Sequence, residues 1–242
     1  MGGAASIEAG CYMLINADFD QLVIEHNTPE KWVESPTKGV TRRMLDRVGG
    51  EVARATSLVR YAPLSAFATH THELGEEYLV LEGDFLDEEG THPVGTYVRN
   101  PPGSMHSPGS ISGCVILVKL RQFQADDRQY VHKAPKDLNW ERSHHSEAVE
   151  YSPLFEDLNE KVRMERWNAG FSAHEFLPFG GELLVVSGAL TLQTAGRDEP
   201  LSVWSWVRLP AGATLTLSAG VQSACVWIKR HLKPATFSKD HV

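Results

Sequence analysis

The sequence predicts an all-β protein built from two tandem barrels, and three observations lead to this prediction. Short apolar, β-rich runs recur with turn residues between them, helical periodicity is scarce, and the second half of the chain repeats the first. With 242 residues, the chain is long enough for two domains of about 100 residues, each with its own core. The expected strands are 55–61, 77–81, 95–98, 114–121, 162–167, 183–186, 203–209, 213–217 and 224–230.

Changes in composition divide the chain into four parts. Residues 1–30 are expected to form an N-terminal extension, and residues 31–125 the first barrel. A polar, weakly periodic segment at residues 126–155 is expected to be a linker. Residues 156–235 then form the second barrel.

The repeat is visible at three places in the chain. Residues 181–190 resemble residues 76–85, and residues 225–229 resemble residues 114–119. The turn Pro210-Ala211-Gly212 corresponds to Pro101-Pro102-Gly103. A period slightly above one hundred residues indicates duplication of a whole domain rather than a solenoid repeat.

The chemistry-bearing residues lie in two patterns of the first half. His70 and His72 are two residues apart, so on a strand both side chains point to the same face. Glu76 follows after a Leu-Gly turn, and a turn at residues 100–103 would return His106 to a neighbouring strand. Three imidazoles and one carboxylate suit a divalent transition metal: iron, zinc, manganese, nickel or copper.

Taken alone, a His-x-His pair in a strand is a weak indication of metal binding, because most histidines are ordinary surface or core residues. Here the pair is followed by Glu76, by Gly83 and by a late Pro-x-Gly-x-x-His pattern that ends at His106. The combined spacing is much harder to reach by chance than any one part. The sequence therefore predicts one divalent metal per chain in the first barrel, with zinc or iron favoured over manganese or nickel.

These two patterns resemble the two signature motifs of the cupin superfamily. The stretch from Arg60-Tyr61 through residues 70–77 to residues 114–123 is most similar to the cupin domain of the ChrR class of zinc-dependent anti-sigma factors. The resemblance implies tandem double-stranded β-helix (jelly-roll) barrels, a bicupin, and a homodimer. It also implies the following set of metal ligands: His70, His72, Glu76 and His106.

The sequence departs from this family at two places. Ser110 stands where the second motif usually ends in asparagine, a change that affects the turn rather than the ligands. ChrR-type proteins also carry an N-terminal helical domain with a Cys/His zinc site, whereas only Cys11 and His26 precede Trp32 here, without zinc-ligand spacing. A sigma factor is therefore not expected as a partner.

The second half has lost the candidate ligands. With the glycines aligned, Glu175, Leu177 and Gly181 replace His70, His72 and Glu76, and a register shifted by one gives Phe176 and Pro178. When the Pro-x-Gly turns are aligned, Leu215 replaces His106; His174 remains without a partner. We expect no transition metal in this barrel. It either supports the first barrel or offers an apolar pocket or a dimer surface.

Three functions are compatible with these residues. In the first, the protein is a metal-dependent dioxygenase that holds a small β-diketone or enediol as its enolate, with Glu76 as a catalytic proton acceptor. In the second, the barrel is a non-catalytic zinc-binding sensor or structural module. The third, isomerisation of a sugar or small acid, has no dedicated base beyond Glu76. Tyr78, Tyr97 and Arg99 flank the ligand-bearing strands and either line the pocket or pack the barrel.

Charge and composition exclude several classes of partner. The formal net charge of −8 and the lack of a basic run argue against nucleic acid. No apolar stretch has the length of a membrane helix, and no signal peptide is recognised. The partner is expected to be a small molecule.

The remaining cysteines and polar residues are given structural roles. Cys114 and Cys225 occupy matching apolar strands and are expected to be core residues, which favours a reducing, cytoplasmic setting. His92 is expected to be exposed in a hairpin. The acidic residues expected to form a solvated hairpin end are Asp84, Asp87, Glu88 and Glu89.

Overall fold

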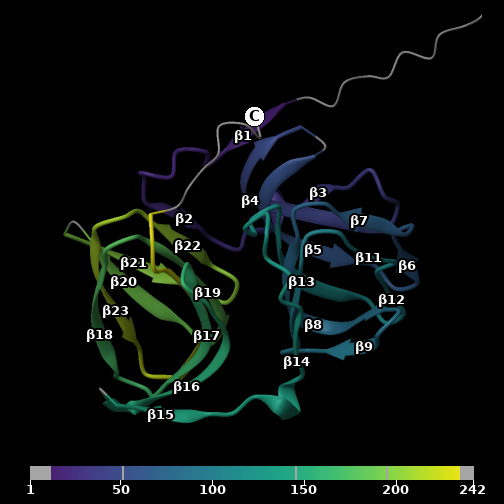
Figure 1. The fold of residues 1–242 in the computed structure, drawn as a ribbon. Coiled ribbons are helices and arrows are strands. Elements are labelled where there is room, and N and C mark those ends of the chain that lie inside the picture. The colour runs from purple at the N-terminus through teal and green to yellow at the C-terminus, as the bar shows by residue number, and fades with distance from the viewer. Residues whose placement is uncertain (1–11, 51, 145, 195, 235–242) are drawn as a thin grey trace, which may run out of the picture.

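The computed structural model describes residues 12–50, 52–144, 146–194 and 196–234. Two β units lie side by side, the first half in blue and teal and the second half in green and yellow (Figure 1). The prediction of a nearly all-β protein is confirmed, and the arrangement is that of two jelly rolls. The expected extension and second barrel reach into residues 1–11 and 235, which lie outside the described residues.

In the first half, one large sheet carries most strands in the order β1-β4-β5-β13-β8-β10-β14, and β7 and β11 form a separate two-stranded ribbon. The elements are β1 (Met13–Ile15), β3 (Val33–Glu34), β4 (Val40–Gly49), β5 (Ala53–Tyr61), β6 (Ser65–Ala66), β7 (His70–His72), β8 (Glu76–Asp87), β9 (Gly90–Pro93), β10 (Tyr97–Asn100), β11 (Ser104–His106), β12 (Gly109–Ser110), β13 (Cys114–Leu120) and β14 (Val131–Lys133).

The second half has two sheets, in the orders β15-β16-β17-β24-β19-β22-β2 and β18-β23-β20-β21. Their strands are β2 (Val23–Glu25), β15 (Glu141–Ser143), β16 (Ser146–Glu156), β17 (Glu160–Trp167), β18 (Ser172–Leu177), β19 (Gly181–Ser187), β20 (Leu190–Thr194), β21 (Arg197–Leu201), β22 (Trp206–Leu209), β23 (Ala213–Ala219) and β24 (Ala224–His231). Two short 3-10 turns, η1 (Pro29–Lys31) and η2 (Pro135–Asp137), are the helical elements of the described residues.

One strand from the N-terminal part of the chain joins the sheet of the second half. β2 lies between β1 and β3 in the chain but pairs with β22 of the second half, where Ile24 lies opposite Val207. β14 follows the first half and pairs with its β10, where His132 lies opposite Val98. β2 and β14 are each followed by a 3-10 turn that begins with proline. Parts of the expected extension and much of the expected linker therefore belong to a sheet; the four-part division of the chain itself remains a prediction.

Apolar side chains gather in three clusters, one inside each half and one between them. The cluster inside the first half includes Val40, Tyr61, Phe85 and Ile116. The cluster between the halves joins first-half residues such as Leu58 to second-half residues such as Trp227. Burying this shared apolar surface makes the two sheets one folded unit, because apolar burial stabilises by about 25 cal/mol per Å².

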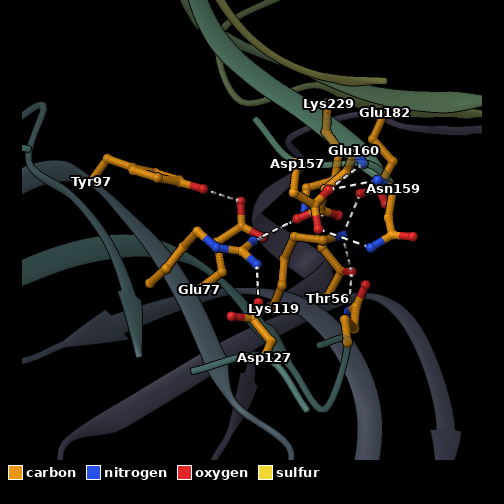
Figure 2. Close-up of polar contacts among 12 residues, drawn as sticks. Thr56, Glu77, Tyr97, Lys119, Asp127, Asp157, Asn159, Glu160, Glu182 and Lys229 are labelled. Atoms are coloured by element: carbon orange, nitrogen blue, oxygen red, sulfur yellow. Dashed lines mark hydrogen bonds and ion pairs between the residues drawn. The ribbon is translucent and has the colours of Figure 1, made fainter. Parts of the chain in front are cut away.

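Two ion pairs cross the apolar layer between the halves in opposite directions. Lys119 Nζ donates to Glu182 Oε2 at 2.6 Å, and Lys229 Nζ donates to Glu77 Oε2 at 2.5 Å. Lys119 corresponds to Lys229 in the repeat, and Glu77 to Glu182, so the two bonds are related by the internal symmetry (Figure 2). Although burial raises the pKa of Glu182, the two lysines outweigh it and lower that pKa to about 2.

Gly83 lies within β8, at a point where two backbones approach closely; the strand does not end there, as the sequence suggests, but continues to Asp87. Its φ is +67°, and a Cβ there would lie 2.0 Å from the carbonyl oxygen of Gly113. Gly83→Ala is therefore expected to destabilise the fold by about 3–5 kcal/mol, from backbone strain and overpacking together. Gly170 has a similar φ of +75°, but a Cβ added to it would meet no atom within 4 Å. In urea unfolding, Gly170→Ala should cost only about 1 kcal/mol, and equal losses would contradict the steric argument.

Candidate metal centre

The ribbon formed by β7 and β11 brings the three predicted histidines together. His70 and His72 share one face of β7, and His106 of β11 lies directly opposite His70. Gly75, with φ +78°, turns the chain so that β8 begins at Glu76. The expected return of His106 to a strand beside His70 is confirmed by this register.

The candidate ligand atoms converge on one point. The ring nitrogens of His70, His72 and His106 form a group whose members all lie within 4.8 Å of one another. The Nε2 atoms of His72 and His106 are 2.9 Å apart, and Glu76 Oε2 lies 3.4 Å from each. Atoms bound about 2.1 Å from a common ion are about 3.0 Å apart at a right angle and about 3.4 Å apart at the tetrahedral angle. The donor spacing fits one divalent cation.

Hydrogen bonds on the outer side of two rings favour metal binding through Nε2. His70 Nδ1 lies 2.9 Å from the carbonyl oxygen of Ala68, which can only accept, so this nitrogen carries the proton. His106 Nδ1 lies 3.4 Å from Asp87 Oδ2. Both arrangements leave an unprotonated Nε2, which is the form that binds a metal.

Burial and charge act differently on the two buried rings. Burial lowers the pKa of His72, which keeps this ring neutral and able to bind a cation. Burial also disfavours charge on His106, but hydrogen bonding to Asp87 and the nearby Glu76 raise the pKa of His106. Since a proton and a metal compete for the same nitrogen, the negative groups around His106 also favour a cation.

Glu76 lies at the edge of the histidine group rather than within it. Its Oε2 accepts a hydrogen bond of 3.0 Å from the side-chain amide of Asn100, which lies directly opposite on β10. Both side chains are buried. The sequence indicates Asn100 only as a turn residue, and nothing in the pattern shows that it would hold the candidate ligand carboxylate.

A cavity of about 410 Å³ opens beside the histidines inside the first half. His70, His72 and Glu76 line it together with apolar side chains of β5 and β13, among them Val59, Tyr61 and Ile116. Arg42 and Arg121 also face this space. The volume lies in the range of small-molecule sites.

Two residues near the site differ from the sequence expectations. His92 is expected to be exposed, but only 3% of its surface is accessible. Asp87 is expected at a solvated hairpin end, but its side chain is 6% exposed. The two side chains bond to each other at 2.7 Å because β8 continues through residue 87 and β9 pairs back onto it. Residue identity alone could not reveal this length of strand.

The three suggested pocket residues belong elsewhere. Tyr78, Tyr97 and Arg99 are buried, and none of them is among the residues that line the cavity. Tyr97 donates to Glu77, and Arg99 pairs with Glu160 of the second half. Their interpretation as packing residues is therefore the correct one, while the interpretation as pocket residues is wrong.

The second half is packed where the first is hollow. Leu177 and Leu215, which occupy ligand-equivalent positions, are buried in its apolar cluster. Glu175 pairs with Arg230 at 3.0 Å, and a Cβ on Gly181 would lie 2.6 Å from the carbonyl oxygen of Lys229. The cavity at this position measures about 20 Å³. These contacts explain what replaced the ligands; the expected lack of metal there remains a prediction.

The tandem jelly rolls and the histidine cluster define a protein of the cupin fold. Residues 20–124 match the family model described as the ChrR cupin-like domain, so the first half of the chain is similar to that domain. A search among curated protein sequences found no match. Within the described residues, no helix is both long and apolar enough to cross a membrane.

Solved structures with a similar fold include proteins related to oxygen chemistry. A proposed dioxygenase from Nostoc punctiforme aligns with a TM-score of 0.70 and 15% identity, covering 90% of this chain and 85% of that one. A cupin 2 conserved barrel domain protein from Leptotrichia buccalis aligns with a TM-score of 0.56 and 12% identity, covering 82% and 92%. Salicylate 1,2-dioxygenase from Pseudaminobacter salicylatoxidans aligns with a TM-score of 0.55 and 10% identity, covering 82% of this chain and 75% of that one. At these identities the likeness establishes the fold alone.

Proposed function

We propose that the first half binds one divalent transition metal through His70, His72, Glu76 and His106 and acts as a dioxygenase on a small β-diketone or enediol. The observation that carries this proposal is the convergence of three ring nitrogens and a carboxylate beside a cavity of about 410 Å³, which His70, His72 and Glu76 line. Zinc and iron suit this ligand set best, and iron is the one that serves oxygen chemistry.

The bound cation would act as a Lewis acid that lowers the pKa of a chelated diketone, and iron in this role also activates dioxygen. The protein supplies the rest of the site. Released from the metal, Glu76 would take a proton from the carbon between the two carbonyls, and the amide of Asn100 donates a hydrogen bond to its carboxylate. Val59, Tyr61 and Ile116 enclose the apolar body of the substrate and exclude water. Arg42 offers a positive charge to the enolate or to an acidic substituent.

The test begins with the metal content of protein purified without oxygen. About one iron or manganese per chain supports the oxygenase, and iron-loaded protein should then consume one O₂ for each β-diketone cleaved to a carboxylic acid and a 2-oxoaldehyde. Both oxygen atoms enter the products, so no reductant is needed. Iron-loaded protein that consumes no oxygen with any diketone or catechol-like substrate would refute this activity.

A second function is favoured by the match of residues 20–124 to the ChrR cupin-like domain. In this alternative the same four residues hold zinc, and the domain senses or stabilises without catalysis. Four protein ligands would close the zinc site, and structural zinc contributes on the order of 10 kcal/mol to folding. One tightly held zinc per chain, together with a large loss of thermal stability on chelation, would favour this alternative over the oxygenase.

The homodimer and the cytoplasmic setting expected from the sequence belong to this proposal as well. Sedimentation of the purified protein tests the first, since a dimer would have twice the mass of the 26.8 kDa chain. A small-molecule ligand is supported by the cavity, which is enclosed by one half of the chain.

A further inference from the structure

A hydrogen-bonded row of side chains runs from the candidate metal centre to the protein surface. His106 Nδ1 lies 3.4 Å from Asp87 Oδ2, and Asp87 Oδ1 lies 2.7 Å from His92 Nε2. His92 Nδ1 in turn lies 3.2 Å from Nε2 of His132, which is exposed. The four residues come from β11, β8, β9 and β14.

The chemistry of these groups fixes the direction of every hydrogen bond. A carboxylate only accepts, so His106 Nδ1–H and His92 Nε2–H both donate to Asp87. A neutral His92 then presents Nδ1 as an acceptor, and His132 donates Nε2–H to it. The one nitrogen left unprotonated at the inner end of the row is His106 Nε2, which faces His72 and Glu76.

Asp87 has no other charged partner that would explain its burial. Its side chain is 6% exposed, and within the described residues its ion pairs are with His92 and His106, not with any lysine or arginine. An isolated buried carboxylate costs several kcal/mol unless it is paired and hydrogen-bonded. A cation bound at His106 Nε2 would polarise that ring and strengthen its bond to Asp87, so the carboxylate and the metal would stabilise each other.

We propose that Asp87 is a positioning residue for the metal centre: it holds His106 with Nε2 turned toward the ion, and His92 and His132 hold Asp87. The inference rests on the proposed function, since it needs a metal at His106. It adds that β14, the strand that follows the first half and pairs with β10, contributes to metal affinity through His132. A purely structural role, in which the row only fastens β9 to β8, would affect folding but not the ring of His106.

Metal affinity of the full-length protein separates the two roles. Zn²⁺ and Co²⁺ dissociation constants are measured by competition with a chromophoric chelator for the wild type and for Asp87→Asn and Asp87→Ala. We expect metal binding about 10- to 100-fold weaker in both variants, the usual effect of removing a carboxylate that supports a histidine ligand. His92→Phe should weaken binding less, and His132→Phe least. His92→Gln can still donate to Asp87 and should bind more tightly than His92→Phe.

A spectroscopic measurement reports on the ring itself. In the Co²⁺-loaded protein, proton NMR resolves the paramagnetically shifted N–H of each histidine bound through Nε2. Asp87→Asn should shift the His106 signal and speed its exchange with solvent. The His70 signal should remain unchanged, because its Nδ1–H donates to the carbonyl of Ala68.

Asp84→Asn is the matched control, because Asp84 lies three residues before Asp87 on the same strand, where alternation directs its side chain to the opposite face, and the described residues include no ion pair of Asp84 with a histidine. The proposal is overturned if both Asp87 variants bind Co²⁺ within about twofold of Asp84→Asn with an unchanged His106 signal. If the Asp87 variants do not fold, the Co²⁺ affinity and the His106 signal of His92→Phe are compared with those of Asp84→Asn instead. A wild type that binds no metal refutes the proposed function and this inference together, whereas normal binding by every variant refutes only the inference.

Discussion

The double variant His70→Ala, His106→Ala should purify without metal, whereas the wild type should carry one ion per chain. The substitution removes two of the three clustered ring nitrogens and leaves only His72 and Glu76, which lie 3.4 Å apart. Two protein ligands do not hold a divalent transition metal against a buffer, since structural sites use four and catalytic sites three. Elemental analysis after exhaustive dialysis measures the stoichiometry directly.

His174→Ala provides the control for this experiment. His174 lies on β18 of the second half, where it is exposed and hydrogen-bonded to Thr216. It directly precedes Glu175, which aligns with His70. Its removal should leave the metal content unchanged. Full stoichiometry in the double variant would mean that the ligands are wrong, and loss of metal in His174→Ala would place a site in the second half.

The site could be predicted from the sequence as far as its spacing is local. His70 and His72 share a face because successive strand residues alternate, and the Pro-x-Gly turn returns His106 to the same ribbon. The contact between Asp87 and His92 could not be predicted, because it depends on how far β8 extends and where β9 pairs with it. Short polar residues at a hairpin give no signal that distinguishes a solvated end from a buried carboxylate.

For the fold, too, local patterns could be predicted from the sequence and long-range pairing could not. The repeat predicts two all-β halves because apolar alternation and turn residues are local properties. The pairing of β2 and β14 could not be predicted, because three-residue strands carry almost no pattern and their partners lie in the other half of the chain or beyond a long loop. The lysine and glutamate pairs between the halves could not be predicted either, since a charged residue within an apolar strand gives no indication of its partner.

Lys229→Met should destabilise the protein by about 3–5 kcal/mol, as expected when one partner of a buried ion pair is removed. Lys229 is 2% exposed and donates to Glu77 at 2.5 Å, and it also lies 3.0 Å from Glu160. Its loss leaves two carboxylates inside the layer between the halves, with Arg99 as their remaining cation. The free energy of unfolding from urea titration measures the cost.

Lys161→Met is the matched control on a neighbouring strand. Lys161 pairs with Glu156 at 2.7 Å, but the two side chains are 34% and 53% exposed, so this pair is worth only about 0–1 kcal/mol. Equal losses in the two variants would contradict the argument from burial. Replacing both partners, as in Lys229→Met with Glu77→Met, removes a charge of each sign and should recover part of the loss. Such recovery would mean that the lysine–glutamate pairs between the halves fix the register of the two sheets more than they contribute to the free energy of unfolding.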